Sequence, residues 1–459
     1  MTNSNADAVT TPYDDPRPAA LQQPIRWSLV TRIAFRFCFC YLLPFGVTGL
    51  FLFAYFMFVM TKSAFWNFDR FDPWRISLPW ICAHIYHVRR KLFIFPDSDS
   101  LSGYLQHLTE LLVAIVATVA WSILDRKPSD YRRLHAWFAL FLRFSLAIVL
   151  FSYGFDKVFP LQFGMLSVGR LSQQVGRMDM FNMLWIFMAS SQPYTVISGA
   201  LEVLAGLLLI TPRLETMGAL LTVPVLTNVF LLNMDYGVPV KIISSHLLLM
   251  AIFLAAPALP GIARLLVLRQ PVPPIVPLEL SARRTVDRAV RTGVAALGAV
   301  LALMTCTAAH TAYEKRLAAS VEAEKLPFYG LWVADTFAVP DANSQSLFTE
   351  RLQKEYHVGP GTDHWLSMAI ESPKRVNLEL RDGTQDGLGF ALDPRTGVAE
   401  LSDSDDPTWK AKLTFQSSGD GLMTVVGTVN GVPISSTWHR RQISDFRLVQ
   451  EKFRWIQPE

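Results

Sequence analysis

The sequence predicts an α-helical integral membrane bundle of about seven transmembrane helices with a C-terminal extramembrane domain, an antiparallel β barrel or sandwich. Three observations lead to this fold class. The 459 residues are 51% hydrophobic and 17% charged, whereas about a quarter of the residues of a typical soluble protein are charged. Long apolar runs recur as far as residue 309. After residue 326, short alternating runs separated by turn residues replace them.

The composition also limits the partners of the protein. Its 12 Trp and 31 Phe favour the two membrane–water interfaces. The net charge of +4 is small and forms no continuous basic stripe, so we expect membrane lipids and no nucleic acid as partners. The polar, Pro- and Ala-rich residues 1–25 are expected to be disordered. They do not read as a cleaved signal peptide, so the first apolar span is expected to remain as an anchor.

Seven spans follow from the length rule, because about 20 apolar residues cross about 30 Å of hydrocarbon. We predict them at residues 34–60, 108–124, 134–155, 194–210, 214–233, 240–257 and 292–309. Segment 76–95 mixes aromatic and basic residues and is expected to lie in the interface plane. The alternative of an eighth span is disfavoured, because Arg89, Arg90 and Lys91 interrupt it. Segment 178–188, "MDMFNMLWIFM", is interpreted as a half-helix or an interfacial turn.

The chain divides into five parts. Residues 1–25 are the polar N-terminus and 26–133 carry two helices and the interfacial segment. Residues 134–260 form a four-helix core, 261–325 a Pro-rich linker, the seventh helix and a stalk, and 326–459 the β domain. In the last part, runs such as "RVNLEL" and "LMTVVGTV" alternate with the turn signals "RDGTQDG" and "SSGDG". Its opening "YGLW" and closing "FRWI" resemble small lipocalin-like barrels.

The basic residues of the loops predict the orientation. They gather in the loops on the side of the N-terminus: Arg26, Arg32, Arg126, Lys127, Arg132, Arg133, Arg213, Arg264, Arg269, Arg283, Arg284, Arg288 and Arg291. We therefore predict a multi-pass protein of the bacterial cytoplasmic (inner) membrane with its N-terminus in the cytoplasm. An odd number of spans then places the β domain outside, in the periplasm.

Ionisable and amide side chains within the four-helix core are candidates for function, because burying them in hydrocarbon is costly. Counted at 1.5 Å per residue, Glu202 lies about 12 Å, Asn228 about 8 Å and His246 about 9 Å from the outer ends of their spans. The predicted ligand or proton site comprises Glu202, His246, Lys241, Asn228, Asp156 and Lys157. Glu202 has Gly199 and Gly206 on its helix face, which favours close packing against a neighbour. A purely structural buried pair or a neutral hydrogen-bonded acid is the alternative interpretation.

Other polar residues are assigned to structure. Arg143 lies on the cytoplasmic half of its span and is expected to snorkel or to bind carbonyls freed near Pro224. Cys38 and Cys40 are interpreted as buried thiols. The predicted topology places Cys82 and Cys306 near the external face and allows a disulfide between them. No metal-binding or nucleophile motif stands in a supporting context, so catalytic residues are not assigned and enzymatic activity is left open.

A resemblance rests on four features: Arg143, "GFDK" at 154–157, "ALEVLAGLLLITPR" at 200–213, and a span ending "LLLMAIFLAAP". With these features residues 134–257 resemble the DoxX family, a four-helix membrane fold of bacteria and archaea. That family takes its name from a subunit of a quinol oxidase complex, and related proteins occur in thiosulfate:quinone oxidoreductases. The resemblance implies a redox-associated or quinone-interacting subunit, with quinone as cofactor and respiratory or other redox membrane subunits as partners.

Two other functions remain open at the level of sequence. The first is a transporter or a lipid- or protein-binding module whose β domain covers an outward-facing cavity. The second is a structural assembly factor without catalysis.

Overall fold

Seven helices in the described part of the chain are long and apolar enough to cross a membrane, as the sequence predicts. The computed structural model describes residues 27–60, 73–88, 99–125, 131–273, 279–339, 365–380, 385–419 and 421–450. The expected disorder of residues 1–25, the basic residues 89–91 and the "FRWI" string therefore lie outside the described residues.

Four helices form the predicted core. They are α4 (Arg132–Val158), α7 (Gln192–Ile210), α8 (Glu215–Asp235) and α9 (Lys241–Ala255). α4 packs against α7 and α9, and α8 packs against both α7 and α9, which closes a four-membered ring. Leu146, Phe151 and Ala205 are fully buried where these helices meet.

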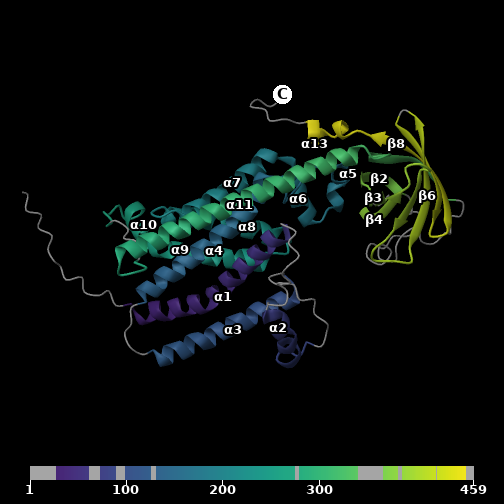
Figure 1. Cartoon of the computed structure of the whole chain (residues 1–459). Helices are drawn as coiled ribbons and strands as arrows, with labels where there is room; N and C mark the ends of the chain where they lie inside the picture. Colours follow the sequence, from purple (N-terminus) through teal and green to yellow (C-terminus); the bar gives the residue numbers. More distant parts are fainter. Residues whose placement is uncertain are drawn as a thin grey trace, which may run out of the picture.

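The remaining spanning helices lie outside this ring (Figure 1). They are α1 (Leu29–Met60), α3 (Leu101–Leu124) and α11 (Arg284–Glu324), and the short helices α2 (Pro73–His84) and α10 (Leu259–Leu266) accompany them. α1 packs on α3, α4 and α9, whereas α11 packs on α4 and α7. α3 begins at Leu101 rather than at residue 108, because Ser100 caps its N-terminus by accepting a hydrogen bond from the Gly103 N–H.

A folded segment connects α4 to α7. It contains α5 (Val168–Ser172), the 3₁₀ turn η2 (Val175–Arg177) and α6 (Met180–Ser190). Segment 178–188 is therefore mostly the short helix α6, whose N-terminus is capped by Asp179. Leu184 and Met188 of α6 pack against Phe163 and Val238.

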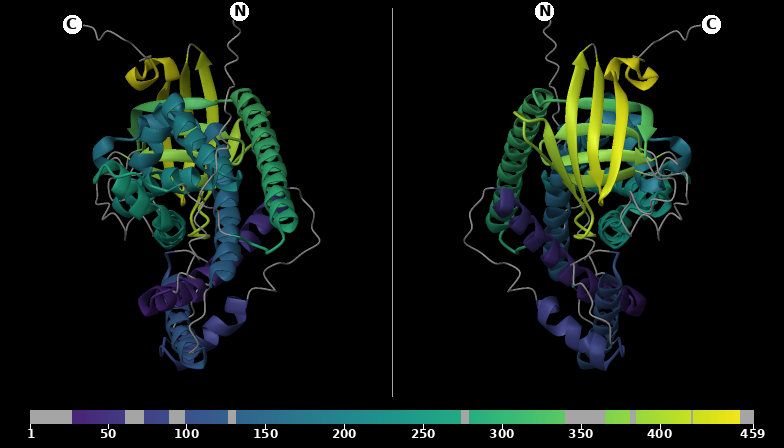
Figure 2. Two further views of the ribbon diagram at one scale, coloured as in Figure 1. Left: turned by 90° about the vertical axis from the view of Figure 1, so that its left-hand side faces the viewer. Right: turned by 90° about the vertical axis from the view of Figure 1, so that its right-hand side faces the viewer.

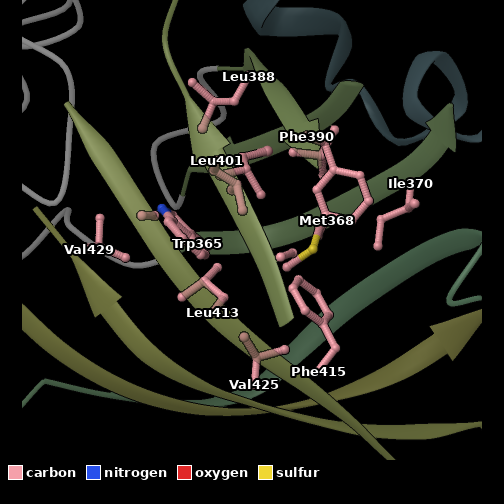
Figure 3. Packing of buried hydrophobic residues seen from close by; sticks show 14 of the residues in the cluster. Trp365, Met368, Ile370, Leu388, Phe390, Leu401, Leu413, Phe415, Val425 and Val429 are labelled. Carbon is pink, nitrogen blue, oxygen red and sulfur yellow. The ribbon is translucent and has the colours of Figure 1, made fainter. Parts of the chain in front are cut away.

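The C-terminal domain is a closed barrel of eight antiparallel strands in sequence order, in which β1 also pairs with β8. Its strands are β1 (Gly330–Ala338), β2 (Trp365–Ser372), β3 (Arg375–Leu380), β4 (Gln385–Leu392), β5 (Val398–Ser402), β6 (Lys410–Gly419), β7 (Leu422–Val429) and β8 (Val432–Arg441). Figure 3 shows apolar side chains such as Met368, Leu413 and Val425 gathered in its interior. The interior is a packed core, which is typical of the narrow space inside eight strands.

The barrel docks on the segment between α4 and α7. α5 packs on β1 and β2, the Gly169 N–H donates to Glu371 Oε1 (3.3 Å), and Gln385 Nε2 donates to the Gly169 carbonyl (3.3 Å). Arg316, on the stalk of α11, donates to the Leu161 carbonyl (3.0 Å). Figures 1 and 2 show α11 running along the bundle to the barrel. The end of the bundle where α4 and α8 finish is therefore its barrel end.

Candidate functional site

A buried ion pair joins α4 and α7 near the barrel end. Lys157 Nζ lies 2.8 Å from Glu202 Oε2. The two residues are 5% and 2% exposed, so neither charge is solvated by bulk water. Two of the six residues predicted for the site are thus in direct contact.

The pair forms where the two helix backbones come closest. A Cβ added to Gly199 would lie 2.5 Å from the Gly154 carbonyl oxygen and 2.6 Å from Lys157 Cβ. Only glycine permits this approach, which is the way small residues pack helices in membranes. Gly206 likewise faces the ring of Phe151. The close-packing face predicted around Glu202 is therefore present.

A cavity of about 60 Å³ adjoins the ion pair and is called the core cavity below. Its polar lining consists of Lys157, Gln162, Glu202, Asn233 and Ser244. Its apolar lining comes from three core helices and the α8–α9 loop: Val149, Leu150, Leu226, Val229, Val238, Val240, Ile243 and Leu247, with Tyr153 at an exposed position. Lys157, Asn233 and Ser244 all lie near helix termini, so the core cavity is at the barrel end.

One polar atom of this lining stands out. Gln162 Oε1 is inaccessible to solvent, and no described residue donates a hydrogen bond to it. Buried amide oxygens are normally paired. The core cavity therefore combines a lysine donor, a carboxylate acceptor and an unpaired amide oxygen with apolar walls. Such a lining suits a small group that both accepts and donates hydrogen bonds.

The other predicted site residues lie elsewhere. Asn228 is exposed on α8 and Asp156 is half-buried on α4; neither lines the core cavity. Lys241 Nζ is 3.2 Å from Asp99 Oδ2. The same carboxylate accepts the N–H groups of Lys241 and Ile242 at the start of α9, which is favourable at a helix N-terminus. The Lys241 ammonium is therefore paired with Asp99 at the start of α9 and does not line the core cavity.

His246 belongs to a second buried polar group, formed with α1 and α3. Its Nε2 is 2.8 Å from Tyr41 Oη, and its Nδ1 is 2.8 Å from the Ile242 carbonyl. Its ring lies 4.5 Å from that of Phe45 and 4.8 Å from that of His107. The predicted site combined His246 with Glu202, but His246 lies with these residues of α1 and α3 instead.

The acidic member of this second group, Glu110, is not among the site residues that the sequence predicts. Glu110 Oε2 is 2.7 Å from His107 Nδ1, and Gln106 Nε2 donates to Glu110 Oε1 (3.1 Å). All three residues are at most 8% exposed. We call Tyr41, Gln106, His107, Glu110 and His246 the Glu110 cluster. The three-residue spacing of His107 and Glu110 indicates neighbours on one helix face, but hydropathy predicts a span that begins at residue 108 and excludes His107.

A third network, made of ion pairs, lies at the end of the bundle opposite the barrel end. Arg143 NH1 is 2.9 Å from Glu215 Oε2, and Arg291 bridges Glu215 (3.6 Å) and Asp287 (2.8 Å). Arg143 Nε also donates to the Ala139 carbonyl. Arg143 is therefore a structural polar residue that joins α4 to α8, and the carbonyl it binds belongs to its own helix rather than to the region of Pro224.

The cysteines are free thiols in the structure, including Cys82 and Cys306. The disulfide that the sequence allowed is not formed there. Burial raises the pKa of the Cys82 thiol on α2, which keeps it protonated and unreactive. No group of three or more potential metal ligands occurs within the described residues.

Fold and sites together define a multi-pass membrane protein with a polar core cavity and a barrel docked at one end. The chain is 32% identical over 123 residues to the uncharacterized protein YwoB of Bacillus subtilis (strain 168), a match that covers 27% of this chain and 75% of that protein. It therefore belongs to the same family as YwoB. No family model matches the chain, and no solved structure matches it.

Proposed function

We propose that this protein is a DoxX-like, redox-associated membrane subunit that binds the head group of a quinone or quinol in the core cavity. The observation that carries the proposal is the unpaired Gln162 Oε1 next to the Lys157–Glu202 pair. A quinone carbonyl accepts hydrogen bonds, and a quinol hydroxyl donates them. Lys157 is a donor for the first, and Gln162 Oε1 and Glu202 are acceptors for the second.

The size of the core cavity sets a condition on this proposal. About 60 Å³ is room for roughly two water molecules, so a ring enters only when the lining rearranges. Tyr153 is 39% exposed and Gln162 lies in the segment between α4 and α7. Both side chains border the core cavity, and a change of their rotamers would enlarge it.

The proposed orientation follows from the basic loops. Arg132, Arg213, Arg264 and Arg284 lie at the end of the bundle opposite the barrel end. By the positive-inside rule this end is cytoplasmic, and the barrel lies outside the cytoplasmic membrane of a bacterium. The core cavity then faces outward, toward membrane-soluble carriers and partner redox subunits.

Organic extraction of the purified protein, followed by mass spectrometry, tests the proposal. We expect a bound quinone, and menadione titration should quench tryptophan fluorescence. Gln162→Leu should weaken binding of menadiol, the reduced form of menadione, roughly fivefold to tenfold, the value of about one hydrogen bond, because the Gln162 Oε1 acceptor for its hydroxyl is lost. The matched control Asn228→Leu makes the same change outside the core cavity and should leave binding unaltered. If no quinone were extracted and menadione did not bind, the proposal would be wrong.

A second function is favoured by the docking of the barrel. α5 fixes the barrel to the same inter-helix segment that supplies Gln162, so the barrel is placed to control access to the core cavity of a transporter or binding module. Under this alternative, Glu371→Ala should change the rate of ligand uptake by proteoliposomes without changing quinone content. Unchanged uptake would reject it.

A further inference from the structure

The Glu110 cluster lies apart from the core cavity, on α1, α3 and α9, and its hydrogen bonds have a defined direction. The Ile242 carbonyl can only accept, so His246 Nδ1 carries a proton. His246 Nε2 is then the acceptor for the Tyr41 hydroxyl. His107 Nδ1 and the Gln106 amide both donate to the Glu110 carboxylate. Neutral His246 is thus held in a single tautomer.

The Glu110 cluster carries a net negative charge, that of the Glu110 carboxylate, when both imidazoles are neutral. Glu110 then carries a negative charge at 8% exposure within an apolar helix. Among the described residues, the one ion pair of Glu110 is with His107, and neither Tyr41 nor Gln106 supplies a positive charge. An uncompensated charge in hydrocarbon costs several kcal/mol by most estimates. One added proton removes that charge.

We propose that Glu110, His107, His246 and Tyr41 form an exchangeable proton-binding site inside the membrane. A proton from water adds to the His107–Glu110 pair, which becomes either an imidazolium–carboxylate pair or a neutral imidazole with a carboxylic acid. No electrons move and no other bond changes. The ring of His246 lies 4.8 Å from that of His107 and is hydrogen-bonded to the Tyr41 hydroxyl, so proton occupancy on α3 is coupled to α9 and α1.

The titratable groups around Glu110 come from each helix packed against α3. They are His107 on α3 itself, Tyr41 and Cys40 on α1, Cys82 on α2 with Tyr86 after it, and His246 and Lys241 on α9. Thiols and phenols are neutral near pH 7, and Lys241 is paired with Asp99. The two imidazoles and Glu110 are therefore the groups assigned to the proposed proton site, and the imidazole is the side chain that ordinarily changes charge near pH 7.

The test uses the full-length, quinone-free protein in lipid bilayers. Solid-state NMR of ¹⁵N-histidine and infrared spectroscopy of carboxyl groups identify the proton at about pH 7. We expect either an imidazolium signal that disappears in His107→Asn or a carboxylic acid band that disappears in Glu110→Gln. The signal should also disappear reversibly when the pH is raised. His310→Asn, which removes a histidine 58% exposed on α11, should leave it unchanged.

Two outcomes overturn the proposal. The first is that the His107–Glu110 pair holds no proton at about pH 7, and the second is that a proton is present but is not released up to about pH 10. Either outcome gives Glu110 a purely structural role. Tyr41→Phe keeps the ring and removes only the hydroxyl, so it provides a second test of the proposal if the Glu110 variant does not fold. It should change the ¹⁵N signal of His246 and shift the pH of proton release. The test does not depend on quinone binding, and menadione titration of Glu110→Gln separates the two proposals.

Discussion

Two buried glutamates in neighbouring parts of the helical bundle are neutralised in different ways. Glu202 meets a lysine at 2.8 Å, whereas Glu110 meets an imidazole at 2.7 Å and an amide at 3.1 Å. A lysine brings a full positive charge, but an imidazole brings one only when it is protonated. The Glu202 pair is therefore a fixed element of the core, whereas the Glu110 cluster can change its charge.

The largest effect is expected from removing the fixed cation. Lys157→Met leaves Glu202 buried without a partner, which should destabilise the protein by about 3–5 kcal/mol. His107→Leu should cost less, about 1–3 kcal/mol, because Glu110 can take up a proton. Thermal unfolding of both variants in the same detergent at about pH 7 measures the difference.

The double variant Lys157→Met with Glu202→Leu is the control. It replaces both charges by apolar groups of similar volume and should recover most of the lost stability. If Lys157→Met were no more destabilising than His107→Leu, the distinction between a fixed and an adjustable charge would be wrong.

The second largest loss of stability is expected from disturbing the glycine contact that brings Lys157 close to Glu202. Gly199→Ala puts a Cβ 2.5 Å from the Gly154 carbonyl oxygen, so α4 and α7 must separate, at a cost of about 1–3 kcal/mol. Gly293→Ala is the matched control, because a Cβ at this helical glycine meets nothing within 4 Å. That change should be neutral or stabilising by up to about 1 kcal/mol.

Unfolding of both glycine variants should be followed together with menadione binding. Gly199→Ala should weaken binding, because the core cavity lies against the same contact. Equal stabilities of the two variants would show that the close approach of α4 and α7 does not hold the ion pair.

Much of this architecture was readable from sequence because it depends on local periodicity. Apolar runs near 20 residues predicted all seven spans, and alternating runs with turn signals predicted the antiparallel domain, which proved to be a closed barrel. Glu202 was identified from its burial in an apolar span, and Lys157 from its place at the end of the preceding one. Their pairing was among several alternatives, since depth along a helix does not specify which face a residue occupies.

The rest depended on contacts between distant segments. Helical rotation puts Asn228 on the exposed side of α8 and turns His246 toward Tyr41, 205 residues away in sequence. The Asp99 carboxylate accepts a hydrogen bond from the first N–H group of α9, although Asp99 is 142 residues away in sequence. The first turns of α3 are polar, so hydropathy predicts a start for this helix that is too far along the chain. His107 therefore fell outside the predicted span. Tertiary packing decided each of these cases.

A third buried carboxylate extends the comparison to the barrel. Glu379 is 4% exposed, and the flanking Leu378 and Leu380 point into the barrel core, so Glu379 is on the outer side of β3. Ser367 donates a hydrogen bond to its Oε2 (2.6 Å), but Oε1 has no partner among the described residues. Burial raises the pKa of this carboxyl above its ordinary 4.5, and the Ser367 hydrogen bond offsets only part of the change. Among the residues that the structure describes, neither a lysine nor an imidazole pairs with Glu379 to balance its charge.

The sign of the pH dependence follows from this raised pKa. Between 4.5 and the folded-state pKa, the folded barrel binds more protons than the unfolded chain, so its stability falls as the pH rises through this window. Glu379→Gln should remove this dependence and increase protection at about pH 7 by on the order of 1 kcal/mol, because a buried neutral amide is desolvated at a lower cost than a buried carboxylate. Hydrogen exchange of β3 peptides in the full-length protein, corrected for intrinsic exchange rates, measures both. Glu400→Gln, a change at a glutamate with a 71% exposed side chain, should alter neither. A β3 that gains protection as the pH rises would show that Glu379 is stabilised as a carboxylate, like Glu202, rather than as an acid.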